Sequence, residues 1–197
     1  ENAKTVHDDD WHIVGNSNYG ASLMLYNNNG KWVFNGKMTL EGPGFLGMDN
    51  TYNNVNATYS TIRFRNSGVV KLNGEVEIRK NVQLTSEHDS SGATFNNTVS
   101  GDGSLYFSHR GAYSFNVANT YAGKTVVGPS STLTVNQSGT LGKGDVEIKA
   151  NGTLKFKNKT ATATDNVITG AGKVAVVNSQ LAIAKEFSVG TLSVDAT

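Results

Sequence analysis

The sequence predicts an all-β chain that winds as a parallel β-helix, a solenoid of stacked coils. Three observations lead to this fold class: the composition, a period-two alternation in short runs, and a glycine motif that recurs along the chain. Glycine occurs 22 times and asparagine 23 times among the 197 residues, whereas proline occurs only 2 times. Asn, Gly, Ser and Thr separate short runs of Val, Ile, Leu, Phe and Tyr, which is typical of many strands joined by tight turns.

The alternation places apolar side chains on one face of each run and polar side chains on the other. Such a pattern predicts half-buried strands, because successive side chains of a strand point to opposite faces. Five triplets read apolar–polar–apolar, at 62–64, 76–78, 133–135, 146–148 and 154–156.

The glycine motif has the form apolar-x-Gly-x-Gly-x-apolar and occurs at 40–46, 99–105 and 168–174. We interpret each interval between successive copies as about three repeat units near the short end of the solenoid range. We expect the glycines to lie where the backbone turns sharply and neighbouring coils pass closely.

Asn-Gly pairs leave a second architecture open. Such a pair commonly marks a two-residue hairpin turn, which would give an antiparallel sandwich or barrel. The fixed order of the polar runs and the Gly-x-Gly copies favour the coil instead. The pairs stand at 29–30, 35–36, 73–74 and 151–152.

A family resemblance covers the segment from Val99 to Phe156. Its pieces are 99–105 (VSGDGSL), 118–127 (ANTYAGKTVV), 131–135 (STLTV), 139–146 (GTLGKGDV) and 151–156 (NGTLKF). In order and spacing they resemble the autotransporter-associated β-strand repeat of type V secreted passengers. Ser131 stands where that family often has Gly before Thr-Leu.

This resemblance implies a right-handed parallel β-helix that is a fragment of a longer passenger. It also implies an outer-membrane β-barrel translocator in the same chain and a location at the bacterial cell surface or outside the cell. The implied partners are a host surface, a glycan or protein receptor, or other passengers. The implied domains are 1–37, a divergent or capping segment of the β-helix, and 38–197, the β-helix with the repeat motifs.

Composition narrows the class of partner. The formal net charge is +1, charged residues make up 17% of the chain and cysteine is absent. The only basic candidate, Arg63-Phe64-Arg65, is too short for a nucleic-acid footprint. The lack of cysteine suits a chain that crosses an oxidising compartment unfolded. No apolar run reaches the length of a transmembrane helix, and both ends look cut.

The densest set of possible metal ligands is the run from His7 to Asp10 with His12. Two imidazoles and three carboxylates could hold a metal, but we interpret the run as an exposed charged segment. Gly42–Gly47 matches Gly-x-Gly-x-x-Gly without a following helix, so a structural turn is expected rather than a dinucleotide site.

Hydrolase signatures are also incomplete. Gly15–Tyr19 misses the nucleophile elbow at its last position, and His88 and His109 lie in expected loops. The acids look scattered and not paired as glycoside hydrolysis requires, with Asp102 and Asp145 in turn motifs and Glu75 and Glu77 at outward strand positions. Exposed aromatics could bind sugars or a partner, although core filling is the favoured interpretation; they are Tyr19, Tyr26, Trp32, Phe34, Tyr52 and Tyr59.

We therefore expect no enzyme activity, no catalytic, metal or cofactor-binding residues, and no cofactor. The expected function is a passenger segment that serves as a surface-displayed adhesin or virulence-factor scaffold and as an export-competent stem. Two alternatives remain: a β-helix enzyme acting on polysaccharide, and a stem attached to an upstream protease domain.

Overall fold

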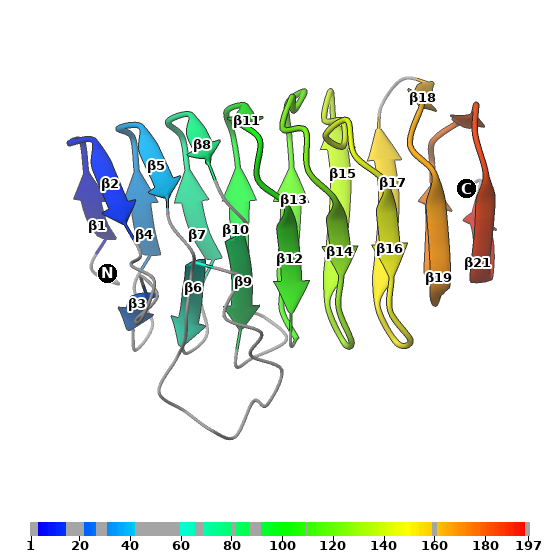
Figure 1. Ribbon diagram of the computed structural model, residues 1–197, viewed down its shortest axis with the longest axis horizontal. Helices are drawn as coiled ribbons and strands as arrows, with labels where there is room; N and C mark the ends of the chain where they lie inside the picture. The colour runs from blue at the N-terminus through cyan, green and yellow to red at the C-terminus, as the bar shows by residue number, and fades with distance from the viewer. Residues whose placement is uncertain are drawn as a thin grey trace.

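The computed structural model describes residues 4–14, 22–26, 31–41, 60–65, 69–79, 82–86, 92–108, 110–158 and 161–195. No helix occurs among these residues, so none of them forms a helix able to span a membrane. All strand pairs within them are parallel. The chain is therefore a parallel β-helix, as the sequence predicts, with coils stacked from the blue to the red end of Figure 1. The antiparallel alternative is wrong for the described residues.

Each coil crosses three faces, and we name a coil by its strand on the first face. The first face holds β1 (Lys4–His7), β4 (Lys31–Phe34), β7 (Val69–Leu72), β10 (Gly92–Phe95), β13 (Ala112–Phe115), β15 (Thr132–Gln137), β17 (Thr153–Asn158) and the C-terminal parts of β19 (Ile168–Val177) and β21 (Phe187–Asp195). The third face holds β3 (Ser22–Tyr26), β6 (Ser60–Arg65), β9 (Val82–Ser86), β12 (Leu105–Ser108), β14 (Thr125–Val127), β16 (Val146–Ile148) and the N-terminal parts of β19 and β21.

The second face is divided. A 4-stranded sheet holds β2 (Trp11–Val14), β5 (Met38–Glu41), β8 (Val76–Ile78) and β11 (Val99–Ser100). Farther along the stack, β18 (Thr162–Thr164) and β20 (Leu181–Ile183) form a separate 2-stranded sheet. The β13 and β15 coils, which lie between these sheets, have no strand on this face.

Coil length changes along the stack. Hydrogen-bonded corner residues of successive coils are separated in sequence by 27 (Asp8 and Asn35) and then by 38 (Asn35 and Asn73). The separation falls to 20 between Asn96 and Asn116, and it is 21 between Asn119 and Thr140. A unit near the short end of the solenoid range, as the sequence indicates, is therefore confirmed for the later coils and exceeded in the first ones.

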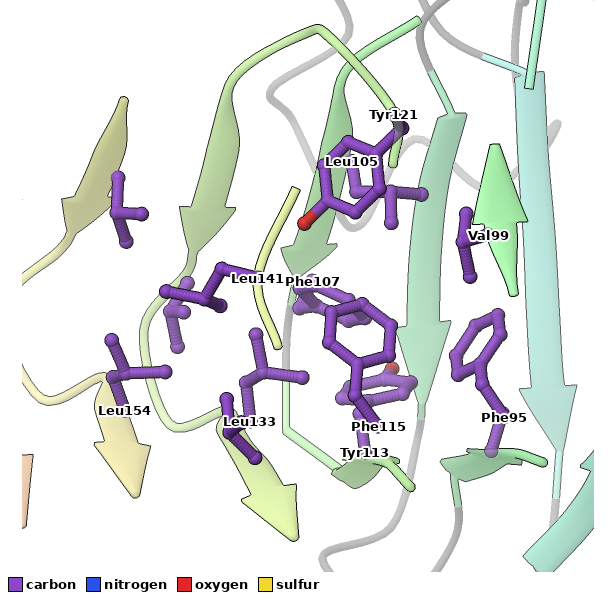
Figure 2. Packing of buried hydrophobic residues seen from close by; sticks show 14 of the residues in the cluster. Phe95, Val99, Leu105, Phe107, Tyr113, Phe115, Tyr121, Leu133, Leu141 and Leu154 are labelled. Atoms are coloured by element: carbon purple, nitrogen blue, oxygen red, sulfur yellow. The ribbon is translucent and has the colours of Figure 1, made fainter. Parts of the chain in front are cut away.

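The core consists of columns of side chains that stack in register. On the first face one column runs through Phe34, Leu72, Phe95, Phe115, Val135, Phe156 and Val176, all at most 5% exposed. Figure 2 shows Phe95 and Phe115 of this column against Phe107 of the third face and Val99 of the second. The Phe95 and Phe115 ring centroids lie 5.2 Å apart in an edge-to-face arrangement, which adds to the burial of apolar area.

The predicted alternation holds wherever side chains are described. Val76 and Ile78 are buried on either side of Glu77, and the triplets at 133–135, 146–148 and 154–156 behave in the same way. The side chains of 62–64 lie outside the described residues.

The two described Gly-x-Gly copies lie at coil corners, but they are not equivalent in the coil. The copy at 99–105 joins the second face to the third, whereas the copy at 168–174 joins the third to the first. Gly101 and Gly170 have φ of +98° and +128°, and a Cβ at either would overlap a carbonyl oxygen of the preceding coil. The sharp turn and close approach are thus confirmed, while the two copies do not mark the same position of the coil.

An asparagine ladder runs along the corner between the first and second faces. The Nδ2 of Asn35 donates to Asp8 Oδ1 at 2.7 Å, and each later amide donates to the Oδ1 of the previous one at 2.7–2.9 Å. The ladder continues through Asn73 and Asn96 and ends at Asn116. Two of the Asn-Gly pairs, at 35–36 and 73–74, lie at this corner, because their asparagines are members of the ladder. The glycine of each pair lies against the backbone of the previous coil.

The N-terminal segment joins the same stack. Strands β1, β2 and β4 pair in parallel with the strands that follow them. The division at residue 37 stays a prediction, because strand pairing alone assigns no separate role to 1–37.

Candidate functional site

The run of possible metal ligands near the N-terminus is split by a corner. His7 ends β1 and stacks with Phe34, ring centroids 5.0 Å apart, while Asp8 begins the asparagine ladder. Asp10 Oδ1 accepts the backbone N–H of Lys37 at 2.7 Å. Among the described residues no group of three or more His, Cys, Asp or Glu side chains is placed to hold a metal.

His12 belongs to a different cluster, a chain of charged side chains on the outward surface of the 4-stranded sheet. Its Nε2 lies 2.8 Å from Glu41 Oε2, and Arg79 Nη1 lies 3.0 Å from the same oxygen. Arg79 Nε is 2.8 Å from Glu77 Oε1, and Lys37 Nζ is 2.7 Å from Glu77 Oε2. We call these five residues the second-face charge network.

The network sets the protonation of its carboxylates. Hydrogen bonds from Arg79 and Lys37 lower the pKa of Glu77 to about 2. The contact with His12, followed by that with Arg79, lowers the pKa of Glu41. Glu77 and Glu41 are therefore anionic at neutral pH, and neither has the raised pKa that a general acid for glycoside cleavage needs.

The described aromatic residues of the first third pack into the solenoid. Phe34 is 2% exposed, and Trp32 stacks parallel to it with ring centroids 6.3 Å apart. Trp11 meets Phe34 edge to face at 5.3 Å. Core filling is thus confirmed for Phe34, and Trp32 packs against the core.

Several candidates of the sequence analysis lie outside the described residues. For Tyr26, Arg63 and Arg65 the strand is described but not the side chain. Asp102 and Asp145 are exposed at corners, as expected, and Glu75 and Glu77 are at half-exposed positions of the second face. The undescribed candidates are Gly15–Tyr19, Gly42–Gly47, Tyr52, Tyr59, His88 and His109.

A pocket opens on the second face between the β15 and β17 coils. Its cavity volume is about 240 Å³. One wall is formed by 140–143 and the other by 162–166, with Lys185 of the next coil beside them. Phe156 lines it from the first face.

Two asparagine side chains bridge the walls near the ends of the gap. The amide of Asn158 donates to the carbonyl oxygens of Gly139 at 3.0 Å and Gln137 at 3.3 Å. The amide of Asn166 donates to those of Gly142 at 2.8 Å and Gly144 at 2.6 Å. Both asparagines are buried.

Sequence reasoning missed both the charge network and the pocket. Glu77 and Arg79 lie two residues apart on the same side of the chain, but their partners Lys37 and Glu41 belong to the preceding coil. Only the strand register brings these oppositely charged side chains together. The pocket depends on where strand pairing stops, which the motif pattern does not indicate.

Comparison with known proteins gives no relative. No family model, no curated protein and no solved structure matches the chain.

Proposed function

We propose that this chain is a non-catalytic segment of a bacterial autotransporter passenger, a β-helical scaffold exported through an outer-membrane β-barrel and displayed at the cell surface. The main support is the agreement between the motifs at 99–156 and the most regular coils. The pieces 131–135 and 151–156 overlap β15 and β17, while 99–105 and 139–146 turn the corners before β12 and β16.

The coil geometry suits progressive folding during export. Each coil contacts mainly its neighbours, so stability accumulates as coils are added. The β13 and β15 coils are of nearly equal length, because Ala112 pairs with Thr132 and Thr132 pairs with Thr153. Glycines also let successive backbones approach at the same corner. Such a chain can close one coil at a time as it emerges from a pore.

The charged side chains support the non-catalytic part of the proposal. Glu41 and Glu77 form ion pairs with cationic side chains. Their lowered pKa values suit surface ion pairing rather than proton donation. As a display scaffold the chain would present these faces to a host receptor, a glycan or other passengers.

An export assay tests the proposal. The chain is placed between a cleavable secretion signal and an autotransporter β-barrel in a Gram-negative host, with an epitope tag at its N-terminus. We expect tag labelling on intact cells and a protease-resistant passenger. Retention in the periplasm, while an unrelated passenger of similar length reaches the surface, would contradict the proposal. Release of reducing ends from polysaccharides by the purified chain would contradict its non-catalytic part.

A further inference from the structure

The pocket between the β15 and β17 coils exists because the two coils are not joined by strand pairing on the second face. In the first coils β5, β8 and β11 form a continuous ladder there. Farther along, β18 pairs with β20, and the segment 139–142 opposite its other edge is not a strand. The stretch Thr140–Leu141 therefore faces Thr162–Ala163 without a ladder between them.

The buried asparagines hold this gap open at a fixed width. Asn158 and Asn166 tie the walls together at opposite ends through bonds to backbone carbonyls. Asn158 is 3% exposed, and its Oδ1 accepts no hydrogen bond from the described residues. Asn158 does not line the pocket itself, so its amide fixes one end of the gap without facing a ligand there.

The charged groups of the pocket favour an anion. Lys143 and Lys185 line it together with a single acid, Asp165. All three side chains are exposed, and none forms an ion pair with the described residues. The balance of two cations against one carboxylate favours a negatively charged ligand over a neutral one.

The remaining lining matches a polyhydroxylated ring. Backbone N–H and C=O groups of the two walls suit sugar hydroxyls, while the exposed Ala163 and the methyl groups of the half-buried Thr140 and Thr162 suit the apolar face of a sugar. The cavity of about 240 Å³ is smaller than the about 300–1,000 Å³ usual for drug-sized ligands, so a single ring fits better than an oligosaccharide chain.

We propose that this pocket binds one acidic sugar residue, of the hexuronate class. Lys143 and Lys185 bind its carboxylate, and the backbone of the two walls binds its hydroxyls. The proposal goes beyond display at the cell surface and does not rest on it, because binding by the purified chain is independent of export.

A titration followed by NMR tests the proposal. Glucuronate added to the labelled chain should shift amides of 140–143 and 162–166 saturably, with a Kd on the order of 1 mM for a ligand of this size. Glucose tests whether the carboxylate is needed, and inorganic phosphate tests whether the ring is needed. We expect glucose to bind at least about tenfold more weakly, and phosphate to leave the Leu141 and Ala163 amides unshifted.

Variants locate the site. Lys143→Gln and Lys185→Gln should each weaken glucuronate binding about fivefold to tenfold, as loss of one charged hydrogen bond predicts. Lys173→Gln, an exposed lysine outside the pocket, serves as the matched control and should change nothing. Ala163→Phe should fill the pocket and abolish binding while the far-UV circular dichroism stays that of the parent chain.

The following results would overturn the proposal. They are equal affinity for glucose and glucuronate, phosphate shifts that match those of glucuronate, and shifts that remain at the same residues in Ala163→Phe. An absence of saturable shifts up to about 50 mM glucuronate, well above the expected Kd, would also overturn it.

Discussion

The N-terminal coils, which begin with β1, β4 and β7, differ from the C-terminal coils, which begin with β13, β15 and β17, in how the second face is held. In the N-terminal coils this face is a sheet that carries the charge network. The β13 and β15 coils have no strand on this face and the β17 coil has only the short β18, so corners fixed by buried asparagines such as Asn119 and Asn166 replace the continuous sheet. The asparagine ladder ends at Asn116, where the regular coils begin.

The difference follows from coil length. The first coils are long and unequal, since the ladder partners are separated in sequence by 27 and then by 38, so corner motifs cannot stack at equal intervals there. Strand pairing and ladders of identical side chains align successive coils instead. Each needs matching residues only within its own strand or corner, so the coils need not be of equal length. In the β13 and β15 coils the separation is 20 or 21, so small corner motifs recur in step and a strand on the second face is unnecessary there.

Core truncation should give the largest effect and should separate the two regions. Phe115→Ala in a C-terminal coil removes a fully buried ring between Phe95 and Phe107, at an expected cost of about 3–5 kcal/mol. Phe34→Ala should cost less, because its ring packs against the partly exposed His7, Trp11 and Trp32. Urea unfolding measures the loss of stability in both variants. Equal losses would contradict a difference in core packing between the two regions.

Alkaline pH should weaken the C-terminal coils next. Burial raises the pKa of Tyr121 to about 12 and also raises that of Tyr113. The folded state thus retains these protons more tightly, so the stabilisation is complete below pH 10 and is lost as pH rises toward 12. For Tyr121 the loss is about 3 kcal/mol at 1.36 kcal/mol per unit. Tyr121→Phe should flatten urea stability against pH in this window, and an unchanged slope would contradict the assignment.

The alternating triplets and the short repeat unit of the later coils could be predicted from sequence because both are local. Val76, Ile78 and Glu77 need only their neighbours in the chain to show which face is buried. The corner role of Gly101 and Gly170 could also be predicted, but not which corner each occupies. The bonds from Asn166 to Gly142 and Gly144 depend on register across two coils, so the pocket had no signature in the sequence.

Removal of a corner asparagine should have an intermediate effect. Asn166→Ala leaves the carbonyls of Gly142 and Gly144 without this donor in a buried corner, at a cost of about 1–3 kcal/mol. Asn73→Ala in the more exposed ladder should cost less, about 1 kcal/mol or below. Thermal unfolding of both variants measures the difference, and a greater loss in Asn73→Ala would reverse the roles assigned to the two corners.

The charge network should give the smallest effect, confined to acid pH and the N-terminal coils. The lowered pKa of Glu77 means that its contribution is present above pH 4.5 and is lost as pH falls through about 2. Because these groups are exposed and screened by salt, Glu77→Gln should slightly lower hydrogen-exchange protection of 38–41 and 76–79 at pH 5 and leave it nearly unchanged at pH 2. Glu186→Gln, which is exposed, is the control, and an equal effect in both variants would contradict a role for the network.

Parallel stacking of successive coils underlies all of these differences, and cysteine cross-linking tests it most directly because the chain has no cysteine of its own. The register pairs Thr132 with Thr153 and Asn136 with Lys157, at the close approach that a disulfide requires. Double variants with cysteine at each of these pairs should both form disulfides under mild oxidation. An antiparallel hairpin would instead join Thr132 to Lys157 and Asn136 to Thr153, and preferential cross-linking of those two pairs would contradict the β-helix.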